Sequence, residues 1–114
     1  MYLEGHNMEI EIRENMRGGQ GSVRIKQIWK EGLPEKCRLF GHLTLEKGCS
    51  IGYHEHVNET EIFYFLKGEG RVNDNGVIRT VKAGDAIHTG GGNGHSVENI
   101  GDEPLEFIAV IILD

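Results

Sequence analysis

Short segments in which apolar and polar residues alternate recur along the chain. Met8–Arg13, Val23–Trp29 and Arg38–Leu45 all follow a period of two, which predicts half-buried β-strands. No stretch keeps an apolar period of about 3.6 residues over three turns, so no long helix is expected. The pattern predicts an all-β domain of about nine or ten strands with one short helical turn.

The second half of the chain continues the strand pattern. An Asn-Gly pair at Asn75-Gly76 lies between two apolar runs, and such a pair strongly predicts a tight β-hairpin. The arrangement is typical of an antiparallel sandwich or a small barrel. The strands predicted in this half are Glu61–Leu66, Gly70–Asn73, Val77–Lys82, His95–Ile100 and Leu105–Leu113.

The side-chain period within Arg38–Leu45 predicts which residues face the core. Leu39, Leu43 and Leu45 share one face of this strand. If the leucines are in the core, Arg38 and His42 point to the outer face, because successive side chains alternate across a strand.

Composition favours a compact single domain. The chain has 114 residues, of which 38% are hydrophobic and 26% charged, with 17 glycines and only two prolines. Glycine is at about twice its usual share of ~7%, which suits many tight turns between short strands. Lys and Arg number 12 against 18 Asp and Glu, so the net charge is −6. This charge argues against binding to a nucleic acid, since a phosphate-backbone binder carries a basic face.

Other features favour a cytoplasmic protein without membrane contact. The longest apolar run, Phe107–Leu113, has seven residues and is too short to span a bilayer. Acidic residues near the N-terminus do not resemble a signal peptide. Cys37 and Cys49 lack the spacing of a metal site, and we expect them to be free thiols in a reducing compartment.

Candidate chemistry centres on His54-Glu55-His56. On a strand the two histidines point the same way, so they can chelate one ion. A hairpin after His56 would bring Glu61 beside them, giving two imidazoles and one carboxylate, a set that suits Fe, Mn, Ni or Zn. The alternative is that these are ordinary surface or interior histidines.

Two longer patterns contain these residues. The first pattern is Gly48-(five residues)-His54-Glu55-His56-(four residues)-Glu61-(six residues)-Gly68, and the second is Gly84-(five residues)-Gly90-Gly91-Gly92-(two residues)-His95-(three residues)-Asn99. The two patterns resemble the two motifs of the cupin family. The second departs from its motif at one point, because Gly90 stands where the family usually has proline.

The resemblance implies a cupin-type double-stranded β-helix, which is a jelly-roll barrel with a metal ion near one mouth. It implies that residues 1–22 form an N-terminal arm and first strand and that residues 23–114 form a single cupin domain. It also adds a fourth ligand, so that the implied ligand set is His54, His56, Glu61 and His95. A divalent ion held in this way has one or two coordination positions left open for water or an anionic ligand.

Three further residues are candidates for a substrate pocket. Phe63 and Phe65 share a face with Glu61 by the period of two, although ordinary barrel core explains them equally well. His88 lies in the strand that leads to the second motif. The glycine-rich Gly90–Gly94 loop is expected to be mobile and to gate the mouth.

In function, the chain looks most like cupins grouped with oxalate decarboxylase and oxalate oxidase. That resemblance implies manganese and a small carboxylate such as oxalate, although no residue can be assigned as the general acid of a decarboxylase. The alternatives are a dioxygenase or isomerase that uses Fe, Ni or Zn, and a non-enzymatic module that binds metal and a small molecule. We also expect a homodimer, because the strand at Met8–Arg13 can cover a sheet edge across a two-fold axis.

Overall fold

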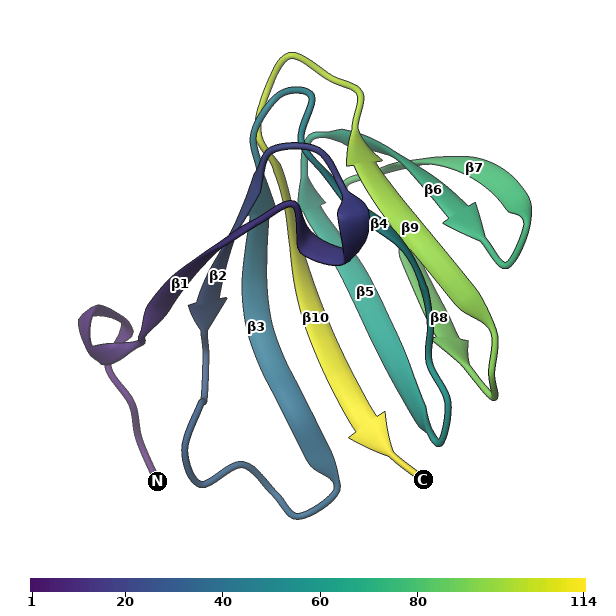
Figure 1. Cartoon of the computed structure of the whole chain (residues 1–114). Coiled ribbons are helices and arrows are strands. Elements are labelled where there is room, and N and C mark those ends of the chain that lie inside the picture. The colour runs from purple at the N-terminus through teal and green to yellow at the C-terminus, as the bar shows by residue number, and fades with distance from the viewer.

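The structure is a computed structural model that describes residues 1–114. It contains ten strands and two 3₁₀ helices, which are shown in Figure 1. Their bounds are η1 Gly5–Asn7, β1 Ile10–Glu14, η2 Met16–Gly18, β2 Ser22–Gln27, β3 Cys37–Leu45, β4 Ser50–Glu55, β5 Glu59–Lys67, β6 Glu69–Asp74, β7 Val77–Lys82, β8 Ala86–Gly90, β9 Gly94–Asn99 and β10 Leu105–Leu113.

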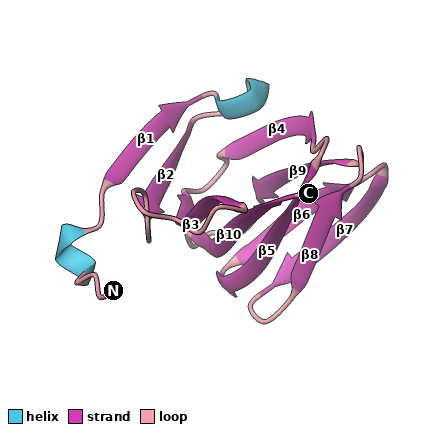
Figure 2. Cartoon of the chain, turned by 90° about the horizontal axis from the view of Figure 1, so that it is seen from below, coloured by secondary structure: helices cyan, strands magenta, loops and turns pink.

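The strands form two antiparallel sheets that pack face to face. The six-stranded sheet has the order β1-β2-β3-β10-β5-β8, and the four-stranded sheet has the order β4-β9-β6-β7. Figure 2 shows the barrel formed by the two sheets from below. The predicted all-β jelly roll, a double-stranded β-helix, is confirmed. No helix is long and apolar enough to cross a membrane.

A single apolar core fills the space between the sheets. Each of its large side chains contributes about 1.5–3 kcal/mol by leaving water. Three phenylalanines lie in this core, and the ring of Phe107 contacts both Phe63 and Phe65. The buried core residues are Val23, Ile25, Leu43, Leu45, Ile51, Phe63, Phe65, Val72, Val81, Val97, Leu105, Phe107 and Ala109.

Several elements follow the sequence pattern closely. Val77–Lys82 and Leu105–Leu113 are strands with the predicted bounds. The hairpin between β6 and β7 turns at Asn75 and Gly76, which have φ of 48° and 96°. Two successive positive φ values are what a type I′ turn requires, so this hairpin prediction is confirmed.

The faces of β3 follow the prediction at one end and depart from it at the other. Leu43 and Leu45 are buried, and His42 lies on the outer face, where its Nε2 is 2.9 Å from Glu106 Oε1. The prediction that Arg38 faces away from the leucines is wrong, because the half-exposed Arg38 lines the same cavity as Leu39 and Leu43.

A β-bulge explains the changed direction of Arg38. Ile111 of β10 pairs with Leu39, whereas the next residue, Ile112, pairs with Cys37. Arg38 is therefore an extra residue without a partner on β10. Such a residue interrupts the regular alternation of side chains along a strand.

The N-terminal arm is part of the same fold. β1 pairs with β2 and forms one edge of the six-stranded sheet. η2 lies against β4 so closely that a Cβ atom on Gly52 would overlap the carbonyl oxygen of Arg17. A backbone bond from the amide of Ser50 to the carbonyl of Gln20, 2.9 Å long, fixes the same contact. The homodimer expected through this edge stays a prediction.

The contact at Gly52 predicts that Gly52→Ala detaches the arm. The added methyl group meets backbone atoms that cannot rotate away, so we expect a loss of about 1–3 kcal/mol in the free energy of unfolding. Urea unfolding would measure the loss. The matched control is Gly5→Ala, whose Cβ would meet only Lys26 Nζ, at 3.8 Å. Equal stability of the two variants would contradict the prediction.

Candidate metal centre

Four side chains from both sheets meet at one end of the barrel. His54 belongs to β4 and pairs in register with His95 on β9, while His56 follows the end of β4. Glu61 is on β5 in the opposite sheet. The hairpin predicted between His56 and Glu61 is wrong, because β4 pairs with β9, and β5 pairs with β10 and β8. The chain crosses from one sheet to the other after His56 and brings Glu61 across the barrel interior.

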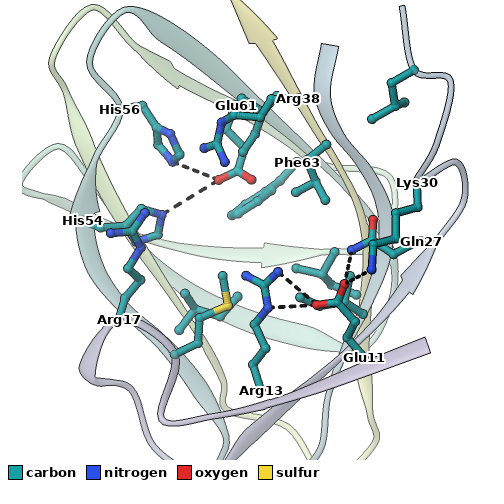
Figure 3. A pocket seen from close by; sticks show the side chains of 17 residues that line it. Glu11, Arg13, Arg17, Gln27, Lys30, Arg38, His54, His56, Glu61 and Phe63 are labelled. Atoms are coloured by element: carbon teal, nitrogen blue, oxygen red, sulfur yellow. Dashed lines mark hydrogen bonds and ion pairs between the residues drawn. The ribbon is translucent and has the colours of Figure 1, made fainter. Parts of the chain in front are cut away.

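The donor atoms of the four residues converge. His95 Nε2 lies 3.2 Å from the Nε2 atoms of both His54 and His56. Glu61 Oε1 lies 3.0 Å from the Nε2 atoms of His56 and His95 and 4.0 Å from that of His54. Two atoms that bind one ion at about 2.1 Å and at right angles lie about 3.0 Å apart. The spacing of this cluster therefore fits a single metal ion, and Figure 3 shows His54, His56 and Glu61 turned toward one point.

The second ring nitrogen of each histidine is engaged in a way that leaves Nε2 free for a metal. His54 Nδ1 donates to the carbonyl oxygen of Gly52 at 2.8 Å, and His56 Nδ1 donates to Glu59 Oε2 at 2.5 Å. His95 Nδ1 is 2.9 Å from the hydroxyl of Thr89. Because a carbonyl or carboxylate only accepts, the Nδ1 atoms of His54 and His56 carry protons. When these two rings are neutral, their Nε2 lone pairs point at the position between the four residues, as in metal-bound histidines.

The surroundings shift the pKa values in opposite directions. Burial by itself raises the pKa of the Glu61 carboxyl, but the adjacent imidazoles of His54, His56 and His95 outweigh it and hold this pKa far below its usual range. The hydrogen bond to Glu61 raises the pKa of His56, whereas burial lowers the pKa of His95.

Glu59 contacts the Nδ1 side of the His56 ring, and Arg38 in turn holds Glu59. The guanidinium of Arg38 donates two hydrogen bonds to the Glu59 carboxylate, at 3.0 and 2.8 Å, and Glu59 in turn accepts from His56. Glu59 lies two positions before Glu61, so the period of two along a strand places both on one face. The spacing of residues in the sequence does not predict that Arg38 points toward Glu59, because the direction of Arg38 depends on the bulge.

A cavity of about 480 Å³ opens beside this cluster and is lined by His54, His56 and Glu61. Phe63 lines it and stacks on His95, with ring centroids 4.7 Å apart and an angle of 17° between the planes. Phe65 is fully buried in the core and does not reach the cavity. The prediction that His88 lines the pocket is wrong, because His88 is exposed on β8 beside Ile62.

The glycine-rich loop is tied to the centre through its backbone. The amide of His56 donates to the carbonyl of Asn93 at 3.0 Å, and the amide of Gly92 donates to the carbonyl of His56 at 2.9 Å. Both bonds hold the Gly90–Gly94 loop beside the first motif. Any gating motion of this loop would have to break them, and gating stays a prediction.

A double-stranded β-helix with three histidines and one glutamate gathered at one end is a small barrel with a candidate metal site. The cupin domain model matches residues 41–111, and the chain belongs to the cupin family.

The similar proteins include relatives with names that refer to oxalate. The chain is 49% identical to an "oxalate-binding protein" of Thermotoga maritima, over 99% of this chain and 94% of the relative. The crystal structure of a predicted oxalate decarboxylase from the same organism superimposes with a TM-score of 0.93 and 44% identity, over the full length of both chains. An oxalate decarboxylase of Bacillus subtilis is 38% identical over 60% of this chain, a match that spans 19% of that enzyme.

The raised pKa of His56 predicts that metal affinity depends on pH. A protonated imidazole cannot bind a metal, so binding must displace the proton from His56. We expect affinity for Mn²⁺ to be highest above the raised pKa and to fall by up to about tenfold per pH unit below it. Titrating the protein with Mn²⁺ at several pH values between about 6 and 8 would measure how the affinity changes with pH. A pH-independent affinity would contradict the prediction.

The contact of Glu59 with His56 predicts a supporting role in metal binding. In Glu59→Gln a neutral amide replaces the carboxylate that accepts the Nδ1 proton of His56, and we expect affinity for Mn²⁺ to fall by roughly 10–100-fold. Glu98→Gln is the matched control, because Glu98 also pairs with an arginine, Arg71, but on the exposed surface. If the two variants bind Mn²⁺ equally well, the supporting role is excluded.

Proposed function

We propose that the chain binds a divalent metal ion, manganese in the first instance, and uses it to hold a small dicarboxylate such as oxalate. The observation that carries this proposal is the convergence of His54, His56, Glu61 and His95 at the inner end of a cavity. Three neutral imidazoles and one carboxylate leave a divalent ion with a net charge of about +1 and with open positions. A chelating dianion matches both properties.

The walls of the cavity add further positive charge. Arg13, Arg17, Lys30 and Arg38 line it, against the carboxylates of Glu11 and Glu61. An anionic ligand therefore enters an environment that attracts it. The name of the Thermotoga maritima relative, similar over nearly the whole chain, supports oxalate as the first ligand to test.

Binding is better supported than decarboxylation. Replacing a carboxylate by hydrogen requires an acid that delivers a proton to carbon. Glu11 lines the cavity, but hydrogen bonds from Arg13, and to a lesser degree from Gln27 and Lys30, lower its pKa, so it is ionised. Both oxygens of Glu59 are already engaged by Arg38 and His56. Neither carboxyl is free to act as that acid.

Turnover of oxalate is the second candidate function. Its support is the similarity to the Bacillus subtilis oxalate decarboxylase, which spans 73 residues. A cupin dioxygenase or isomerase would use the same ligands with Fe, Ni or Zn, so the identity of the bound metal separates these alternatives.

Elemental analysis of untagged protein, purified without chelator or added metal, tests the metal centre. We expect near-stoichiometric manganese, and its loss in His54→Ala/His56→Ala, which removes two of the four ligands. His6→Ala/His88→Ala is the matched control, because both of these histidines are exposed and neither belongs to the cluster.

Calorimetry with oxalate on the Mn²⁺-loaded protein then tests the ligand. Binding of oxalate without release of CO₂, with or without O₂, supports the binding function, and CO₂ release selects the enzyme. Failure to take up any divalent metal would refute the proposal, as would a metal-loaded protein that does not bind oxalate.

A further inference from the structure

Four cationic side chains line the cavity, and three of them already have carboxylate partners. Arg13 contacts Glu11 Oε2 through Nε and Nη2 at 3.2 and 3.0 Å. Lys30 Nζ lies 3.0 Å from Glu9 and 3.4 Å from Glu11. The fourth cation is Arg17, which forms no ion pair and no side-chain hydrogen bond with the protein.

Arg38 is the third cation with a carboxylate partner, and that partner also contacts His56. Its guanidinium binds both oxygens of Glu59, which also accepts from His56. Recruiting Arg38 to a ligand would therefore remove the support behind the metal centre. Arg17 can bind an anion without breaking any existing contact.

The backbone of Arg17 adopts a conformation that is unfavourable for a residue with a Cβ atom. Its φ is 55° and its ψ is 30°, in the left-handed region. Glycine would adopt this conformation without strain. A turn that served only to shape the arm would gain nothing from a long cationic side chain here, and strained residues that persist are found preferentially at functional sites.

The same turn is fixed in place over the mouth of the barrel. The carbonyl oxygen of Arg17 packs against Gly52, two residues before His54. The amides of Gly18 and Gly19 donate to the carbonyls of Asn15 and Met16, at 2.9 and 3.0 Å. In Figure 3 the Arg17 side chain extends from this turn in the direction of His54, and both residues line the cavity.

We infer that Arg17 is a ligand-positioning residue, whose guanidinium binds the carboxylate oxygens that face away from the metal. The inference rests on the proposed function, because it assumes an anionic ligand in this cavity. A planar guanidinium presents two parallel N–H donors that match a carboxylate. The N-terminal arm would then complete the binding site as well as the sheet.

Oxalate binding to Mn²⁺-loaded variants tests the inference. We expect Arg17→Gly and Arg17→Gln each to weaken oxalate binding by about 10–100-fold, the usual effect of losing a charge-assisted hydrogen bond. Affinity for Mn²⁺ should stay within about twofold, because Arg17 contacts none of the ligands through a hydrogen bond. Arg17→Gly should unfold at the same or a higher urea concentration than the natural protein, since glycine relieves the strain.

The matched control is Arg24→Gln. Arg24 is exposed on β2, has no carboxylate partner and lies outside the cavity, so this variant changes the net charge equally. If Arg17→Gly and Arg17→Gln bind oxalate as the natural protein does, the role of Arg17 is refuted while the proposed function stands. An equal loss in Arg24→Gln would likewise refute it, because the effect would be one of overall charge. A natural protein that binds Mn²⁺ but not oxalate would overturn the proposed function and this inference together.

Discussion

The convergence of three imidazole nitrogens and a carboxylate oxygen in a buried space is the constraint on which the site depends. Polar atoms removed from water cost several kcal/mol unless they find partners, and lone pairs pointing at one position repel each other. The protein supplies partners behind the cluster, through the carbonyl of Gly52, the hydroxyl of Thr89 and the carboxylate of Glu59. In front of it, a cation is the partner that satisfies all four donors at once.

This constraint requires a rigid scaffold, which the two sheets provide. His54 is on β4, His56 follows the end of β4, His95 is on β9 and Glu61 is on β5, so the four residues come from opposite layers of the barrel. Phe63 connects the centre to the core, because it stacks on His95 and also contacts Phe107. The apolar packing between the sheets thus sets the distance across which the ligands face each other.

Local pattern was sufficient to predict most of the strands and three of the four clustered residues, His54, His56 and Glu61, while His95 was added by the resemblance to the cupin motifs. Strands such as Leu105–Leu113 alternate cleanly, and the hairpin at Asn75 and Gly76 follows from a turn that needs two positive φ values. The spacing of His54, His56 and Glu61 also indicated a common site. The route of the chain between them was not predictable, because spacing does not tell whether two strands belong to one sheet or to two.

The errors have the same physical origin. The face of a residue follows from its position only while the strand stays regular, and the bulge at Arg38 breaks that rule. His88 could not be given a face without its register against β5. The contacts of the arm with β4 join residues about thirty positions apart, such as Gln20 and Ser50, which no local pattern encodes.

The bulge at Arg38 has a consequence for how such a site can change over generations. It consists of one additional residue on β3, so the loss of a single codon at this point could restore regular pairing with β10. The guanidinium would then leave Glu59, although none of the four clustered residues had changed. Among relatives that keep His54, His56, Glu61 and His95, a difference of one residue in length at this position would therefore mark chains in which the ring of His56 is held by other contacts.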